Sequence, residues 1–181
     1  LDIDTGVTLT INGPLLAGNY QIFRGGGLVD LSGNNRLVEG IVDWWGTNTT
    51  PGTTDMTTAI QSALTAMGAN SRTRLLAADY LVTSTISIVN DRVHLVGSGK
   101  YETQILFSPT ANDTLLYVIR GSTTINQGSI RDMTLFSNDN TWIKIAIDLI
   151  DISGYSISDL DIGGSAVVGN SGFWADPNLG S

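Results

Sequence analysis

Short stretches of alternating apolar and polar residues run through most of the chain. Residues 7–11 alternate with a period of two, as in a strand with one buried face, and Asn12-Gly13-Pro14 then marks a turn. Similar stretches bounded by Gly, Asn, Asp or Ser cover residues 20–23, 28–31, 74–76, 80–82, 85–88, 93–96, 103–107 and 114–119. Strands this short are not stable alone, so the pattern predicts sheets built from many paired strands.

Residues 54–67 have helical spacing instead. The apolar positions that recur with this spacing are Ile60, Ala63, Leu64 and Met67. Gly68 is expected to end the helix. Thr53 or Thr54 can cap its first turn, where Asp55 would interact favourably with the helix dipole. This is the one helix that the sequence predicts.

A seven-residue pattern occurs twice near the end of the chain. Residues 129–135 (Ser-Ile-Arg-Asp-Met-Thr-Leu) are echoed 27 residues later by residues 156–162 (Ser-Ile-Ser-Asp-Leu-Asp-Ile). A repeat of this length indicates a solenoid, whose coils stack as parallel strands about 4.8 Å apart. Ile130, Met133 and Leu135 can all point inward if Arg131-Asp132 forms a corner between two strands.

Several segments resemble a known family. The run Asp43-Trp44-Trp45-Gly46, a Thr/Gly-rich loop and residues 54–64 are similar to the opening segment of the pectate-lyase superfamily, which includes phage tailspikes and polysaccharide depolymerases. Residues 93–99 resemble that family's Val-x-Leu-x-Gly-x-Gly turn. The chain departs from the family pattern in the loop, which lacks its Asp, at Met56, which replaces a second Asp, and at Ala78, which replaces a Gly.

The resemblance implies an all-β fold: a right-handed, single-stranded parallel β-helix (solenoid) with one N-terminal capping α-helix. We expect an N-terminal short-strand segment (residues 1–42), an opening loop with the capping helix (43–72) and the first coils of the solenoid (73–181). On this reading the chain is the N-terminal part of a longer protein.

The same resemblance implies a polysaccharide partner, a homotrimer, and an extracellular or virion-tail location. Three functions stay open. The chain could belong to a polysaccharide lyase or glycoside hydrolase whose catalytic residues lie partly or wholly outside it. It could be a non-catalytic glycan-binding module, or a structural capping or assembly segment of a larger fibre.

The amino-acid composition argues against several classes of partner and cofactor. The 181 residues include 9 Lys and Arg and 17 Asp and Glu, which gives a net charge of −8. A phosphate backbone or an anionic membrane surface would repel such a chain, which argues against a nucleic-acid partner. No apolar run approaches the ~20 residues of a membrane span, so no membrane insertion is expected. With no Cys and a single histidine, His94, we predict no metal and no cofactor.

Carboxylates are the candidate catalytic groups. Hydrolysis of a glycosidic bond uses two carboxylates that flank it. Asp132 and Asp159 occupy equivalent positions of the repeat and would stack on adjacent coils, and Asp148 and Asp161 lie nearby in the sequence. The alternative is that aspartates at such corners hydrogen-bond their own turn.

Aromatic residues are the candidate sugar-binding groups, because ring faces suit the apolar faces of sugars. Trp142 beside Lys144, together with Trp174, is the predicted substrate-binding set. For Trp44 and Trp45 a packing role is favoured over sugar stacking. His94, between Val93 and Leu95, is expected on an outer face as an ordinary surface residue.

Overall fold

The computed structural model describes residues 1–32, 39–110, 113–119, 125–137, 144–150, 152–164 and 173–175. Within them lie one α-helix, α1 (Thr57–Met67), and a 3₁₀ turn (Val42–Trp44). The N-terminal strands are β1 (Asp2–Ile3), β2 (Thr8–Thr10), β3 (Arg24–Gly25), β4 (Leu28–Asp30) and β5 (Glu39–Ile41). After α1 come β6 (Ser71–Arg74), β7 (Asp79–Val82), β8 (Ile86–Ile88), β9 (Val93–Val96) and β10 (Gln104–Phe107). The last are β11 (Asp113–Ile119), β12 (Ile125–Ser137), β13 (Lys144–Ile150), β14 (Ile152–Gly164) and β15 (Phe173–Ala175).

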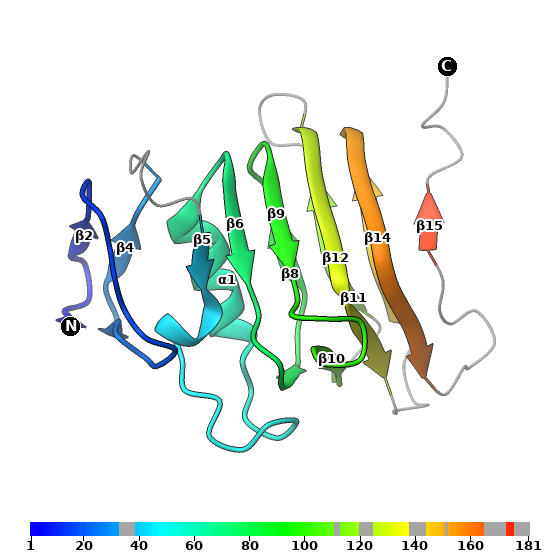
Figure 1. The fold of residues 1–181 in the computed structure, drawn as a ribbon, viewed down its shortest axis with the longest axis horizontal. Coiled ribbons are helices and arrows are strands. Elements are labelled where there is room, and N and C mark those ends of the chain that lie inside the picture. The colour runs from blue at the N-terminus through cyan, green and yellow to red at the C-terminus, as the bar shows by residue number, and fades with distance from the viewer. Residues whose placement is uncertain are drawn as a thin grey trace.

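The strands form four sheets in which every described pair is parallel. A seven-stranded sheet has the order β5-β6-β9-β12-β10-β7, with β14 paired to β12, and a four-stranded sheet has the order β15-β13-β11-β8. Two small sheets, β1-β3 and β2-β4, lie at the N-terminal end of the molecule (Figure 1). Helix α1 lies behind β5 and β6 in this view.

The prediction of a right-handed parallel β-helix is wrong. The described strands are divided among several sheets and do not form a single stack of coils. In the largest sheet, β9 pairs with β12 at residues 129–131, and β10 pairs with β12 at residues 134–136. Two short strands therefore pair with different parts of one long strand. The physical reason is that one clear repeat determines how two strands pair, and it leaves the path of the remaining chain open.

The strand pairing predicted from the 27-residue repeat is confirmed. Strands β12 and β14 align with Ser129 opposite Ser156 and Leu135 opposite Ile162, which is the 27-residue offset. Of the residues expected to point inward, Ile130, Met133 and Leu135 are fully buried. The expected corner is instead a left-handed residue inside one continuous strand, because Asp132 has a φ of 60°.

Helix α1 ends where predicted and begins three residues late. Gly68 takes a φ of 64°, a left-handed value that glycine adopts without strain, and it donates to the Leu64 carbonyl. At the other end Asp55 accepts hydrogen bonds from the Thr57 amide at 2.9 Å and the Thr57 hydroxyl at 2.6 Å. The prediction that Thr53 or Thr54 caps the helix is therefore wrong.

The main core lies between α1 and the two larger sheets. Its fully buried members include Val42, Ile60, Leu75, Tyr80, Val82, Ile86, Leu95, Ile105, Leu116, Ile130, Met133 and Ile147. A second, smaller cluster joins Ile3, Phe23 and Trp44. This smaller cluster attaches the N-terminal segment to the turn that precedes α1, and the candidate site lies beside it.

Candidate functional site

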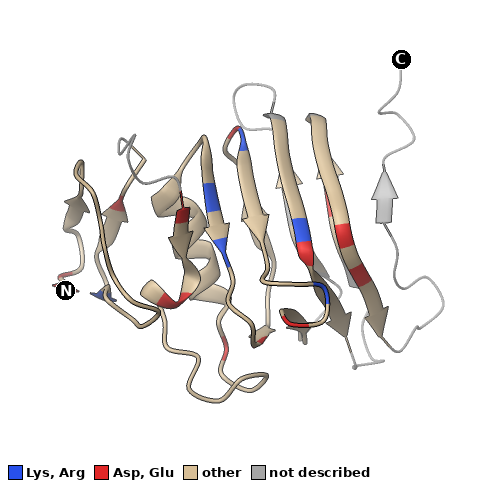
Figure 2. Ribbon diagram, in the orientation of Figure 1, with Lys and Arg blue, Asp and Glu red and all other residues tan. Residues whose placement is uncertain are grey.

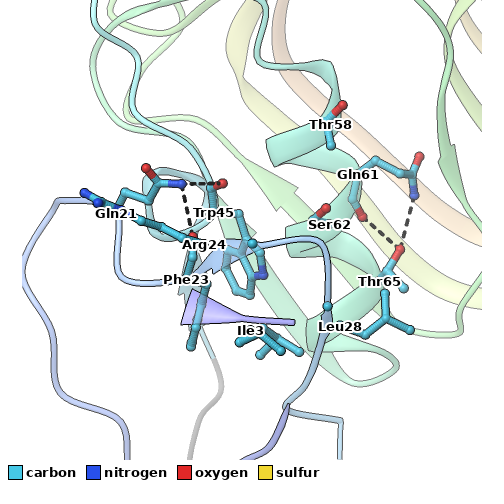
Figure 3. A pocket seen from close by; sticks show the side chains of 13 residues that line it. Ile3, Gln21, Phe23, Arg24, Leu28, Trp45, Thr58, Gln61, Ser62 and Thr65 are labelled. Carbon is cyan, nitrogen blue, oxygen red and sulfur yellow. Dashed lines mark hydrogen bonds between the residues drawn. The ribbon is translucent and has the colours of Figure 1, made fainter. Parts of the chain in front are cut away.

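A cavity of about 530 Å³ lies between the N-terminal segment and one face of α1 (Figure 3). Its walls are formed by Ile3, Gln21, Phe23, Arg24, Gly25, Gly27, Leu28, Val29, Trp45, Thr58, Gln61, Ser62 and Thr65. Figure 3 shows the side chains of α1 on one side and those of the N-terminal segment with Trp45 on the other. Its volume is within the range of about 300–1,000 Å³ that is usual for small-molecule sites.

The helical wall is a polar stripe. Residues three and four apart share one face of a helix, so Thr58, Gln61, Ser62 and Thr65 all face the same way. The opposite face of α1 carries Ile60, Ala63 and Leu64 into the core. The amphipathic pattern that forms the helix therefore also supplies the hydroxyl and amide groups of the cavity.

Close approach of two backbone segments shapes the other wall. Strands β1 and β3 pair at Asp2–Arg24 and Ile3–Gly25. A Cβ atom on Gly25 would lie 2.2 Å from the carbonyl oxygen of Ile3, and one on Gly27 would lie 2.2 Å from a methyl group of Ile3. Only glycine allows this approach. Residues 25–27 therefore form a tightly packed wall of the cavity.

Three aromatic rings stand together at the base of the N-terminal segment. The ring centroids of Phe23 and Trp45 are 5.1 Å apart, and those of Trp44 and Trp45 are 6.1 Å apart. Trp44 is buried, and its indole N–H donates to the carbonyl of Gly18 at 2.9 Å. The packing role predicted for Trp44 is confirmed. Trp45 is only partly buried, however, and it also lines the cavity.

Two glutamine side chains on the cavity walls are held in place. The Gln21 amide donates to the carbonyls of Phe23 at 3.0 Å and Trp45 at 3.2 Å. The Gln61 amide is bound to the backbone of Ser87 through both of its ends. Because these amides are already satisfied, they fix the shape of the cavity.

Other polar groups on the walls are free to bind a ligand. The side chains of Arg24, Thr58 and Ser62 make no hydrogen bond or ion pair with any residue that the structure describes. Of the described lining residues, Arg24 alone carries a charge. The cavity thus offers an aromatic surface, free hydroxyl groups and one guanidinium, a combination suited to a ligand with many hydroxyl groups.

The predicted carboxylates lie elsewhere, in the larger sheets. Asp132 and Asp159 are neighbours, because the pairs Arg131–Ser158 and Met133–Leu160 flank them. Asp161 pairs with Thr134 in the same sheet, whereas Asp148 lies in β13 of the four-stranded sheet, opposite Trp174. The structure therefore brings two of the four together and assigns Asp148 to a different sheet. In the described ranges, no group of three or more His, Cys, Asp or Glu residues could hold a metal ion.

None of the predicted sugar-binding residues is among the described residues that line the cavity. Trp142 lies outside the described residues. Lys144 begins β13 and Trp174 lies in β15, and the structure describes their backbone but not their side chains. The residues that do form the cavity were missed. The polar positions Thr58, Gln61, Ser62 and Thr65, which recur at helical spacing, were the signal that could have found them.

Comparisons with known proteins find a similarity to a phage protein. No protein-family model and no curated protein matches it. Among solved structures, the ORF18 protein of Geobacillus virus E2 is similar, with a TM-score of 0.60 and 25% sequence identity. The match covers 68% of this chain and 25% of that protein, so the chain corresponds to about a quarter of its length. None of the described helices is long and apolar enough to cross a membrane.

Proposed function

We propose that the chain is a segment of a phage structural protein that binds an extracellular glycan in the cavity beside α1. The observation that carries this proposal is the lining of the cavity. It combines the partly exposed indole ring of Trp45 with the free polar groups of Arg24, Thr58 and Ser62. Aromatic rings pack against the apolar faces of sugars, and the free groups hydrogen-bond to sugar hydroxyls.

The similarity to a phage protein supports a location on the virion for this proposed function. Binding in the cavity requires no metal and no catalytic carboxylate. The chain would therefore act as a receptor-binding module in the virion tail.

The test is a binding screen against capsular, pectic and alginate-like polymers and their oligosaccharides, followed by calorimetry on any positive. Ser62→Phe fills the cavity from the helical wall. It is expected to weaken binding at least about tenfold, which corresponds to about 1.4 kcal/mol. Ser84→Phe is the matched control, because Ser84 is exposed and does not line the cavity. Absence of saturable binding across the panel, or equal affinity of Ser62→Phe and wild type, would overturn the proposal.

A second candidate, an assembly segment, is favoured by exposed apolar side chains. Within the described residues, large apolar side chains on the surface concentrate in the N-terminal segment: Leu1, Val7, Leu16, Tyr20 and Leu28. Leu16 is 95% exposed and Tyr20 is 64% exposed. Contact with a protein partner would cover such side chains, and a second and third copy of the chain are the partners that the resemblance implies.

Light scattering during gel filtration tests this assembly role. We expect a trimer that Leu16→Ser combined with Tyr20→Ser converts to monomer. Tyr101→Ser serves as the control, since Tyr101 is 80% exposed but lies outside the N-terminal segment. A wild-type chain that is monomeric at high concentration would remove the assembly role from this segment.

A further inference from the structure

Cationic side chains gather on the outer face of the seven-stranded sheet, although the chain as a whole has a net charge of −8. Arg72 and Arg74 lie on β6 and Arg131 lies on β12, and β9 pairs with both strands. Figure 2 shows blue segments on β6 and β12. The register places Arg72, His94 and Ser129 in one row across these strands. Two residues further along these strands, Arg74 and Arg131 lie on either side of Val96.

Because side chains alternate between the two faces of a strand, Arg72 and His94 lie on the same face of the sheet. Arg72 lies between the buried residues Ser71 and Thr73, and His94 lies between the buried residues Val93 and Leu95. Since successive side chains of a strand point to opposite faces, Arg72 and His94 both point away from the core. The ring Nδ1 of His94 is 2.8 Å from the hydroxyl of Ser129, which holds the imidazole in place.

Negative charge lies at the margins of this cluster. Glu39 on β5 is 3.3 Å from Arg72 and 3.5 Å from Arg74, and Asp132 forms an ion pair with Arg131. The groups that face His94 are Arg72 from β6, and Arg131 and Ser129 from β12; none of them is a carboxylate. Burial first, and then the charges of Arg72 and Arg131, lower the pKa of His94 below its ordinary value. The guanidinium groups of Arg72 and Arg131 therefore contribute positive charge at the imidazole.

We propose that Arg72, His94 and Arg131 form a binding site for an anionic group, a carboxylate, phosphate or sulfate, on the outer face of the seven-stranded sheet. The planar guanidinium groups suit such oxyanions, because two N–H groups of one arginine can bind two oxygens. A bound anion would also favour the protonated imidazole, which adds a third cation to the site. Affinity is therefore expected to rise as the pH falls through the pKa of His94. This site is separate from the cavity beside α1.

The single histidine makes the test direct. In a chain prepared without a histidine tag, the imidazole protons of His94 give one set of proton NMR signals, whose pH titration reports the pKa. We expect saturating amounts of a site-specific anion to raise this pKa by about one unit, the size of shift that a neighbouring opposite charge produces. The probes are inorganic phosphate, sulfate and galacturonate, with galactose as the neutral sugar. A response to galacturonate alone indicates a carboxylate presented on a sugar, and a response to phosphate or sulfate alone indicates a tetrahedral anion.

Sodium chloride at matched ionic strength is the essential control, because simple screening of the two arginines also raises the pKa of His94. Arg72→Gln and Arg131→Gln should each abolish the saturable part of the shift. Lys100→Gln, which removes the same charge from a loop outside the cluster, should retain it. The proposal is overturned if sodium chloride reproduces the whole effect, if no probe saturates, or if Lys100→Gln weakens the response as much as the arginine variants do.

Discussion

The side-chain amide of Gln61 pairs with the backbone of Ser87 as a neighbouring strand would. Its oxygen accepts from the Ser87 N–H at 2.8 Å, and its nitrogen donates to the Ser87 carbonyl at 3.1 Å. Ser87 is the central residue of β8, the edge strand of the four-stranded sheet. An edge strand presents unpaired N–H and C=O groups, and here one residue of α1 satisfies both.

Removal of this amide should destabilise the protein. We expect Gln61→Ala to lower the free energy of unfolding by about 1–3 kcal/mol, because two partly buried backbone groups lose their partners. Thr58→Ala on the same helix should change it by less than about 0.5 kcal/mol, since the exposed Thr58 hydroxyl is without a partner in the described structure. Urea unfolding measures both, and hydrogen exchange at Ser87 should accelerate in Gln61→Ala alone. Equal stabilities of the two variants would show that the Gln61 contact contributes nothing.

The start of α1 should make stability depend on pH. Burial tends to raise the pKa of Asp55, but the hydrogen bonds from the hydroxyl and amide of Thr57 and the hydroxyl of Thr83 outweigh it and lower the pKa below 3.8. A carboxyl group with a lowered pKa stabilises the folded state above its unfolded pKa, and this contribution is lost as the pH falls through the lowered value. Asp55→Asn should therefore cost about 1 kcal/mol at neutral pH, a charge effect at a helix N-terminus.

That difference should shrink as the pH falls below the ordinary value of Asp55, 3.8. Thermal unfolding across the acid range measures it. Asp4→Asn is the control, because Asp4 is exposed and its side chain makes no hydrogen bond to a described residue. A cost for Asp55→Asn that is constant with pH would show that the charge of Asp55 is not what stabilises the helix start.

Tyr80 connects three parts of the chain through one buried hydroxyl group. It donates to Asp43 at 2.9 Å and accepts from the Leu76 N–H at 2.9 Å, while its ring lies fully buried in the main core. Burial, together with the charge of Asp43, raises the pKa of Tyr80 above its ordinary value. Burial likewise raises the pKa of Asp43, and the hydrogen bond from Tyr80 partly offsets this.

Tyr80→Phe should therefore cost about 1–3 kcal/mol, because the amide of Leu76 and the carboxylate of Asp43 both lose a buried partner. The cost should be larger at neutral pH, where Asp43 is ionised, than at acid pH, where it is neutral. Tyr101→Phe, at an exposed ring, should be within about 0.5 kcal/mol of wild type. A pH-independent cost would mean that packing, and not the hydrogen bond to Asp43, accounts for the loss.

Local patterns in the sequence predicted local structure well. The apolar spacing of residues 54–67 predicted a helix, and Gly68 predicted its end. The 27-residue repeat predicted the pairing of β12 with β14, because residues at equivalent places in a repeat meet equivalent neighbours. Alternation predicted strands at residues 7–11 and 28–31, and the structure has β2 and β4 there. At residues 20–23, by contrast, no strand forms.

Features that join distant segments could not be predicted in the same way. The cavity combines Ile3, the 21–29 segment, Trp45 and one face of α1, and no periodicity connects these parts. The hydrogen bonds from Gln61 to Ser87 and from Tyr80 to Asp43 also span long separations. The solenoid prediction failed for the related reason that it extended one local repeat to the whole chain.

Two roles of Asp159 can be tested separately: its backbone conformation and the chemistry of its carboxylate. Its φ of 49° is a left-handed value, and its neighbour in the repeat, Asp132, has a φ of 60°. Most residues with a Cβ atom lose about 1–2 kcal/mol in this conformation, whereas Asn tolerates it and Gly adopts it freely. Asp159→Ala should therefore reduce the free energy of unfolding by about 1 kcal/mol, while Asp159→Asn and Asp159→Gly should not.

The same variants test catalysis by Asp159, because Asp159→Asn removes the carboxylate without disturbing the backbone. Wild type and variants are compared by denaturant unfolding and by product release from the glycan panel, with reducing ends and unsaturated uronates followed together. If a backbone role is sufficient, Asp159→Asn matches wild type in both measurements. Loss of product release in a fully stable Asp159→Asn would instead make Asp159 a catalytic carboxylate, with Asp132 the first candidate for its partner.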